Sequence, residues 1–282
     1  MTKHTHYEVR YTTNPTDFKA YGTERIRQDF LIPQLFEKNK IHWVYSHYDR
    51  YMAGGVFPGS EKLALETIDP LKADFFLERR ELGIINIGQT GVVEVDGTHY
   101  QLEHKEALYI GKGNKEVLFS SLNADQPAKF YLNSATAHHA YPNKLIRQSD
   151  AEVVELGDLT TSNARTIRKL IVNSVVDTCQ LQMGMTELKT GSVWNTMPAH
   201  THDRRMEIYL YFGVPEGQSV CHFMGQAQAT RNVWLQNEQA VISPPWSMHC
   251  GAGTSNYNFI WGMCGENLDY GDMDGFTPTE MQ

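Results

Sequence analysis

This chain of 282 residues has few cysteines and no long apolar run. Its four cysteines, Cys179, Cys221, Cys250 and Cys264, form no C-x-x-C pair, which argues against a disulfide scaffold and favours reduced thiols. No apolar run approaches the roughly 20 residues that a membrane-spanning helix needs. The first residues are polar and lack the apolar core of a secretion signal, so we expect a cytoplasmic protein.

Positive charge is also scarce. Lysine and arginine total 25 against 33 aspartate and glutamate residues, which gives a formal net charge of −8. This balance argues against general binding of nucleic acid or of an anionic membrane, and no basic helix-turn-helix pattern is visible. An anionic substrate would not be steered in by the whole-protein field, so local arginines would have to bind it.

Helical patterns are few, and most segments are typical of short β-strands. Residues 92–100 contain β-forming residues around Asp96-Gly97, the strongest short signal for a hairpin. Short helices are expected only within 23–36 and 162–168. Many short strands separated by glycine and proline turns predict an all-β sandwich or barrel with a few short helices.

The sequence contains an internal repeat. Residues 75–88 lie over residues 200–213 without a gap, and both segments contain an acidic-Arg-Arg turn and end in glycine. Further on, 107–113 lie over 240–246 in the same order. We therefore expect an N-terminal arm (1–30), an N-terminal barrel (31–150) and a C-terminal barrel of the same design (151–282). The tail after Asn267 is expected to lie on the surface.

Three histidines and one glutamate form the main candidate site. His200 and His202 would lie on one face of a strand, because side chains alternate along a strand. Residues 203–206 resemble a turn that lets Glu207 face inward on the next strand, and His249 arrives from a proline-led loop at 244–248. Three imidazole nitrogens and a carboxylate oxygen suit zinc, ahead of manganese, iron or nickel.

The first copy of the repeat has lost this ligand set. The positions that correspond to His200, His202, Glu207 and His249 are occupied by Phe75, Leu77, Leu82 and Glu116. Only the second barrel is therefore expected to hold a metal ion.

The motif resembles that of the cupin superfamily. It combines Gly191, the H-x-H-x4-E pattern, the closing Gly213 and a second motif that runs from a proline to His249. Trp246 departs from the superfamily at a turn position where glycine is usual, which puts the turn shape in question but not the ligand. The resemblance implies two tandem jelly-roll barrels, a bicupin.

Longer strings resemble the 5-keto-4-deoxyuronate isomerase family, also called 4-deoxy-L-threo-5-hexosulose-uronate ketol-isomerases. The strings that carry this resemblance are 45–47, 76–83, 85–88, 111–113, 127–131, 194–198, 200–202, 204–207 and 259–263. The family implies a hexamer with one zinc ion in the C-terminal barrel of each subunit, held here by His200, His202, Glu207 and His249. Its members act on ring-opened unsaturated uronates released from pectin or glycosaminoglycans.

The implied reaction moves a carbonyl from the aldehyde carbon to the neighbouring hydroxyl-bearing carbon and yields 3-deoxy-D-glycero-2,5-hexodiulosonate. A Lewis-acid cation stabilises the enediolate while a general base moves the proton, and a hydride shift is the competing route. Arg165, Arg204 and Arg205 are candidates for binding the substrate carboxylate. The pair Arg204-Arg205 has a second interpretation, because the first copy keeps Arg79-Arg80 without a metal: it can brace the turn or a subunit contact.

Tyr209, Tyr211 and Glu238 are candidates for the acid and base. The two tyrosines are expected to point inward beside Glu207, where at least one of them fills the barrel. Glu238 precedes the strand that leads towards His249, and a solvated loop carboxylate is the alternative. Three other functions are weighed against the isomerase: a cupin dioxygenase, a non-catalytic sugar-binding cupin, and an isomerase of another sugar such as a phosphosugar.

Overall fold

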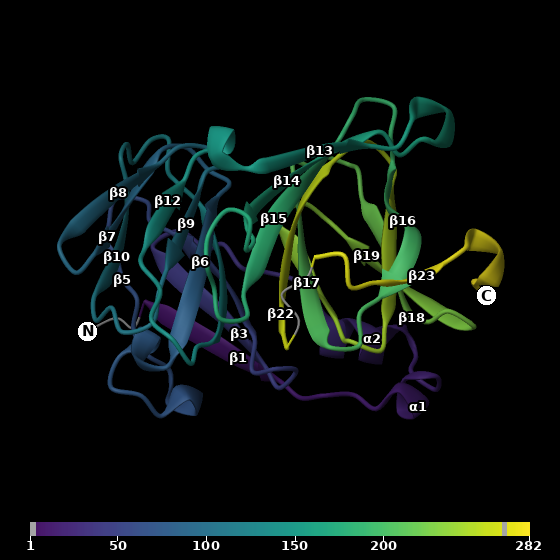
Figure 1. Cartoon of the computed structure of the whole chain (residues 1–282), viewed down its shortest axis with the longest axis horizontal. Coiled ribbons are helices and arrows are strands. Elements are labelled where there is room, and N and C mark those ends of the chain that lie inside the picture. The colour runs from purple at the N-terminus through teal and green to yellow at the C-terminus, as the bar shows by residue number, and fades with distance from the viewer. Residues whose placement is uncertain (1–3, 267–269) are drawn as a thin grey trace. The chain divides into compact units, whose positions relative to one another are not determined.

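The computed structural model describes residues 4–266 and 270–282, which form two compact units made mostly of β-strands (Figure 1). Unit 1 comprises Met1–Arg10, Leu35–Glu152 and Leu170–Met183, and unit 2 comprises Tyr11–Gln34, Val153–Lys169 and Gly184–Gln282. The expected all-β class is confirmed. The domain boundaries expected near residues 30 and 150 stay a prediction. Within the described ranges no helix has the length and apolar character needed to cross a membrane.

Two sheets are built mainly from the first half of the chain. A seven-stranded sheet has the order β1-β3-β4-β11-β6-β9-β12, and a four-stranded sheet has the order β5-β10-β7-β8. The strands are β1 (Thr5–Arg10), β3 (Lys40–Ser46), β4 (Met52–Phe57), β5 (Leu63–Ala64), β6 (Arg80–Asn86), β7 (Gly91–Val95), β8 (Thr98–Leu102), β9 (Ala107–Ile110), β10 (Val117–Ser121), β11 (Phe130–Thr136) and β12 (Lys144–Ile146), and the 3-10 turns are η1 (Asp69–Leu71), η2 (Phe76–Glu78) and η3 (Gln148–Asp150).

The other two sheets repeat this plan. Their orders are β13-β14-β15-β22-β17-β20-β2 and β19-β18-β21-β16-β23. The elements are α1 (Pro15–Phe18), α2 (Thr23–Phe30), β2 (Leu31–Ile32), β13 (Glu152–Leu156), η4 (Leu159–Thr161), β14 (Arg165–Ile171), β15 (Gln182–Leu188), β16 (Trp194–Thr201), β17 (Arg205–Phe212), β18 (Val220–Gln226), β19 (Ala229–Leu235), β20 (Gln239–Ser243), β21 (Met248–Gly253), β22 (Asn258–Gly265), β23 (Asp274–Phe276) and η5 (Pro278–Glu280).

Strand register confirms the internal repeat. In β6, Leu82 pairs with Ile110 of β9, and in β17 the corresponding Glu207 pairs with Ser243 of β20. The apolar core of unit 1 includes Leu82 itself, which is fully buried. The first barrel therefore packs hydrocarbon where the second presents a carboxylate.

Local sequence explains two outcomes. The hairpin at 92–100 is confirmed as β7 and β8, and its turn residues Asp96 and Gly97 take φ angles of 45° and 83° that suit the twist of a two-residue hairpin. The helix expected at 162–168 is wrong: Arg165–Ile171 forms β14. The β-branched Thr166 and Ile167 favour a strand there. Pairing of β14 with β13 and β15 outweighs the Thr/Ser signal for a helix start.

Candidate functional site

His200, His202, Glu207 and His249 converge in unit 2, where one candidate ligand atom from each lies within 4.8 Å of the others. His200 lies on β16 and pairs in register with His249 of β21, and Glu207 reaches the same point from β17 in the other sheet. His202 follows the end of β16, before a turn at 203–204 that is shorter than the turn expected at 203–206, because β17 already begins at Arg205. The loop position expected for His249 is wrong, because this residue is the second residue of β21.

Hydrogen bonds fix the orientation of two of the rings. His202 Nδ1 lies 2.9 Å from the carbonyl oxygen of Arg205, and His249 Nδ1 lies 3.3 Å from that of Ser247. A carbonyl can only accept, so each Nδ1 carries a proton and Nε2 is the ring nitrogen left to face the cluster. Backbone partners of this kind orient metal-binding histidines in proteins.

The Nε2 atoms of these two rings point at one carboxylate oxygen. Glu207 Oε2 lies 3.2 Å from His202 Nε2 and 2.8 Å from His249 Nε2. The buried His249 Nε2 nevertheless has no aligned hydrogen-bond partner among the described residues. Atoms held tetrahedrally at 2.1 Å from zinc are ~3.4 Å apart, so the donor set and its spacing fit a divalent cation.

Burial and neighbouring rings set the protonation of His200 and Glu207. Burial lowers the pKa of His200 to about 3, with His249 adding to the effect, so the ring is neutral and can act as a ligand at pH 7. Burial alone would raise the pKa of Glu207, but the adjacent His249 and His202 rings bring it well below its usual range. Glu207 is therefore a carboxylate, which suits a ligand better than a proton-accepting base.

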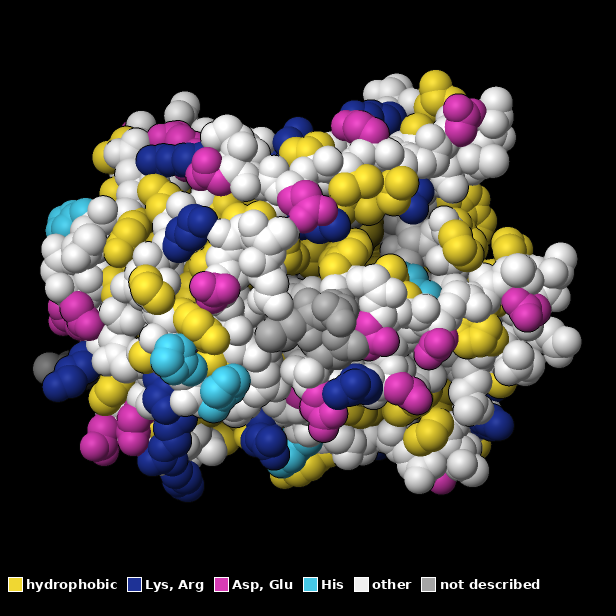
Figure 2. Space-filling view, in the orientation of Figure 1, with side chains coloured by type: hydrophobic (Ala, Val, Ile, Leu, Met, Phe, Trp, Pro, Cys, Tyr) yellow, Lys and Arg dark blue, Asp and Glu magenta, His cyan; other side chains and the backbone are white. Residues whose placement is uncertain are grey.

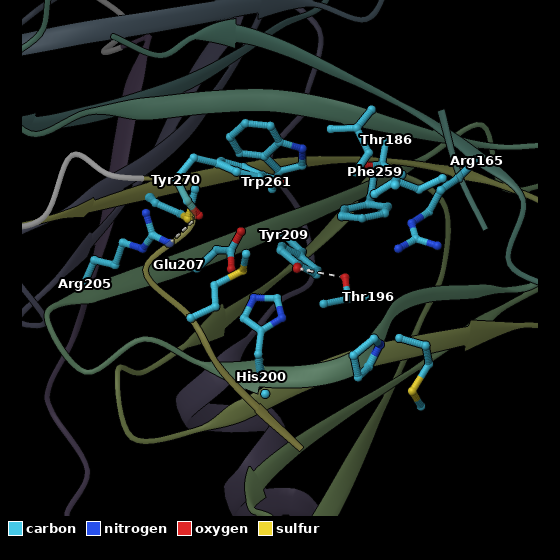
Figure 3. A pocket seen from close by; sticks show the side chains of 17 residues that line it. Arg165, Thr186, Thr196, His200, Arg205, Glu207, Tyr209, Phe259, Trp261 and Tyr270 are labelled. Carbon is cyan, nitrogen blue, oxygen red and sulfur yellow. Dashed lines mark hydrogen bonds between the residues drawn. The ribbon is translucent and has the colours of Figure 1, made fainter. Parts of the chain in front are cut away.

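A cavity of about 270 Å³ opens onto this cluster. One wall is formed by strands of the seven-stranded sheet. Glu207 and Tyr209 on β17, and Arg165 and Ile167 on β14, line the cavity together because residues two apart on a strand point to the same face. The remaining lining residues are Leu156, Thr186, Thr196, Met197, Pro198, His200, Arg205, Phe259, Trp261, Met263, Tyr270, Met273 and Gly275. Figure 2 shows the hollow rimmed by apolar side chains, and Figure 3 shows its interior.

The three candidate arginines have different environments. Arg165 is 9% exposed and lines the cavity, and its Nη1 donates to the carbonyl oxygen of Asn163 at 2.9 Å. Burial lowers its pKa, since the charged guanidinium has lost water. Arg205 also lines the cavity, but it donates to the carbonyl oxygens of Tyr270 and Asp272. Arg204 is exposed, lies outside the cavity and forms an ion pair with Glu266.

The three acid-base candidates are also separated. Tyr209 lines the cavity, and its Oη lies 3.1 Å from Thr196 Oγ1. Burial, with the Glu207 charge, raises its pKa, so its hydroxyl stays protonated. Tyr211 points inward as expected but is fully buried outside the cavity lining, with Oη 2.8 Å from His222 Nδ1. Glu238 lies in a turn at the other end of β17, where its N–H bonds the Tyr211 carbonyl oxygen.

Sequence reasoning missed two parts of this site. Residues 270–282, the described part of the tail, are largely exposed, as expected, but Tyr270, Met273 and Gly275 line the cavity, and Gly275 of β23 pairs with His200. Thr196 was not singled out either, although it belongs to the string 194–198. No periodic pattern could reveal it, because β16 is irregular between Asn195 and His200.

Comparison with known proteins places the chain in a family. A model of the KduI/IolB family matches residues 30–274. The chain belongs to the KduI/IolB family. A relative in this family from Formosa agariphila, named 4-deoxy-L-threo-5-hexosulose-uronate ketol-isomerase, is 60% identical over 278 residues and 99% of each chain. One of the same name from Bacteroides fragilis is 56% identical, again over 99% of each. The resemblance inferred from sequence is confirmed.

Solved structures confirm the cupin-type fold. An IolB-like protein from Salmonella typhimurium has a TM-score of 0.65 at 16% identity, covering 80% of this chain and 86% of that one. Oxalate decarboxylase from Lactobacillus farciminis has a TM-score of 0.56 at 10% identity, covering 80% of this chain and 79% of that one. At such identities the similarity concerns the fold alone.

Proposed function

We propose that this protein is a metal-dependent ketol-isomerase that converts 4-deoxy-L-threo-5-hexosulose uronate to 3-deoxy-D-glycero-2,5-hexodiulosonate. The name shared by relatives that are 60% and 56% identical supports the reaction. One observation in this chain carries the proposal. A single cavity is lined by His200 and Glu207 of the cluster and also by the buried cation Arg165. A six-carbon acid with an aldehyde at one end and a carboxylate at the other matches those two features.

Arg165 would bind the substrate carboxylate. A guanidinium that is 9% exposed has lost most of its water, and the described cavity lining contains no carboxylate except Glu207 in the metal cluster. A bound carboxylate would supply the missing charge through two parallel hydrogen bonds. We therefore place the acid end of the substrate at Arg165 and the reacting carbons at the cluster.

His200, His202, Glu207 and His249 would hold the cation, and we propose zinc because the donor set is of borderline softness. A divalent cation bound there would act as a Lewis acid towards the carbonyl and hydroxyl oxygens of the two reacting carbons. The isomerisation moves one hydrogen from C2 to C1 and one proton from O2 to O1, so it needs no external oxidant. Exclusion of water by the apolar walls, including Phe259 and Trp261, protects that transfer.

Among the three acid-base candidates, we propose Tyr209 as the group that contacts substrate. It lines the cavity and stays protonated, so it can donate a hydrogen bond to a substrate oxygen. Tyr211 and Glu238 lie outside the lining, and we assign them no contact with substrate. A hexameric assembly and a cytoplasmic role in the breakdown of pectin or glycosaminoglycan uronates complete the proposal, as the family resemblance implies.

The test is turnover followed by NMR. An unsaturated disaccharide is hydrolysed enzymatically, and its ring-opened monomer is supplied to the purified protein with one equivalent of zinc, with and without a chelator. We expect resonances of a 2,5-diketo acid to replace the aldehyde hydrate, and the chelator to stop the change. Fully metallated protein that leaves the monomer unchanged, or that consumes oxygen with it, would overturn the proposal.

A further inference from the structure

Thr196 has an unusual backbone conformation for its residue type. Its φ angle is 51°, in the left-handed region, and it is the sole β-branched residue among the non-glycine positions with positive φ in the described ranges. A branched Cβ crowds the backbone there, so a threonine in this conformation is strained. Strain of this kind persists where the surrounding structure and a functional requirement hold it.

The strain arises in a bulge next to the metal cluster. Asn195 of β16 pairs with Gly251 of β21, and His200 pairs with His249, so four residues of β16 face one residue of β21. The extra residues bend towards the cavity, and Thr196, Met197 and Pro198 all line it. The bulge thus brings a threonine hydroxyl into a wall that a regular strand would build differently.

The Thr196 hydroxyl meets the Tyr209 hydroxyl across the two sheets. Thr196 Oγ1 lies 3.1 Å from Tyr209 Oη, and Figure 3 draws this contact in a view where the pair lies between His200 and Arg165. Two hydroxyls that share one hydrogen bond have one O–H left over. Whichever is the donor, the pair offers one directed O–H between the two ends of the cavity.

We propose that Thr196 is a positioning residue that fixes the Tyr209 hydroxyl for donation to an oxygen of the substrate's middle carbons. The proposal rests on the proposed function. When the Thr196 hydroxyl donates to Tyr209 Oη, the Tyr209 O–H is free to be directed into the cavity. Without that partner, the phenol O–H can take either of its two orientations in the ring plane and donates in the productive direction for only part of the time.

A purely structural role for Thr196 is the competing explanation. In that case the hydroxyl satisfies the buried Tyr209, and its removal lowers stability but not the rate per folded molecule. The two explanations differ for a glycine. Thr196→Gly removes both the hydroxyl and the strained Cβ, because glycine adopts positive φ without strain. We therefore expect it to keep or raise the melting temperature and yet lose activity.

The experiment compares zinc-loaded wild type with Thr196→Val, Thr196→Ser, Thr196→Gly and Tyr209→Phe, and with the double variant Thr196→Val/Tyr209→Phe. Thr166→Val is the matched control. Thr166 lies on β14, is buried, donates a hydrogen bond from its hydroxyl to Glu155, and is not among the residues that line the cavity. Measured quantities are kcat, KM, zinc content and melting temperature.

We expect Thr196→Val and Thr196→Gly to lower kcat ~10- to 100-fold, with KM within about threefold and zinc unchanged. Thr196→Ser should stay within about threefold of wild type, and Thr166→Val should keep kcat. In the Tyr209→Phe background, the Thr196→Val change should cost less than about twofold, since the two residues act as one unit.

Active wild type with an equally active Thr196→Val variant would overturn the positioning role and leave the proposed function standing. The same holds if Thr196→Val costs as much in the Tyr209→Phe background as in wild type, or if its loss of activity merely follows lost zinc. Wild type that is fully metallated but inactive would overturn the proposed function, and the positioning role with it.

Discussion

Glu207 Oε2 lies 2.8 Å from Nε2 of His249, yet the two atoms are not aligned for a hydrogen bond. Both side chains are almost fully buried, at 3% and 1% exposure. A buried imidazole nitrogen without a hydrogen-bond partner is costly, and a cation bound between these atoms removes that cost. The arrangement is what four ligands directed at a common centre produce.

Glu207→Gln should therefore release the metal. The amide keeps the shape of the side chain but loses the negative charge and one of its two acceptor oxygens, so we expect zinc affinity to fall at least ~100-fold. Zinc content by mass spectrometry and the rise in melting temperature on adding zinc both check this. Glu116→Gln makes the same chemical change at an exposed position of the first barrel and should bind zinc as wild type does. Equal zinc affinity in both variants would contradict the ligand set.

Removing the Arg165 charge should impair substrate binding but not the fold. Two charged hydrogen bonds contribute ~2–3 kcal/mol, so Arg165→Met should lower kcat/KM roughly 100-fold, and Arg165→Lys should rescue little because lysine lacks the planar fork. The melting temperature should hold or rise, since a buried cation without a bound anion is destabilising. Arg204→Ala removes an exposed ion pair with Glu266 and should change kcat/KM less than twofold. Steady-state kinetics on the three variants decides this.

Arg80 and Arg205 occupy equivalent positions in the repeat and should respond differently. Arg80 donates to Ser134 and to the carbonyl oxygen of Arg50, far in sequence from the cavity-lining residues. Arg205 bonds the carbonyl oxygens of Tyr270 and Asp272, next to the cavity wall. Each change to methionine leaves buried or half-buried acceptors unpaired and should cost ~2–3 kcal/mol of unfolding free energy. Only the change at Arg205 should also raise KM; an equal KM effect at Arg80 would contradict this view.

His222 should make the metal-free protein sensitive to acid. Burial, assisted by His249, lowers its pKa to about 3, against about 6.5 for an unfolded histidine. Between these values the unfolded chain binds a proton that the folded chain does not, so stability falls as pH falls from about 6.5 to 3, by at most ~1.4 kcal/mol per pH unit. Chemical unfolding of His222→Gln at several pH values should show a shallower decline. The exposed His99→Gln should keep the wild-type slope.

The sequence predicted the architecture well because the repeat carries its own register. The alignment matches Leu82 with Glu207 and Ile110 with Ser243, and the structure pairs Leu82 with Ile110 in one sheet and Glu207 with Ser243 in the other. The ligand quartet followed from residue type and from the alternation of side chains along strands. Both features depend on the order and spacing of residues along the chain, so they can be read from a single sequence.

The remainder of the site depends on contacts between segments far apart in sequence. Thr196 reaches Tyr209 through a bulge, and Gly275 reaches His200 through a short strand that the acidic tail did not suggest. Arg204 and Arg205 are neighbours with the same chemistry, yet one is exposed and the other is buried. Arg204 ends the turn that precedes β17 and Arg205 begins the strand, and periodicity cannot fix a register within a turn.

The most direct test of the metal centre is anomalous diffraction from crystals of zinc-loaded protein, recorded on both sides of the zinc absorption edge. We predict a single strong peak in unit 2, about 2.0–2.2 Å from one atom each of His200, His202, Glu207 and His249. A peak elsewhere, or these four side chains turned apart with no anomalous density between them in protein that carries one zinc per chain, would contradict the account.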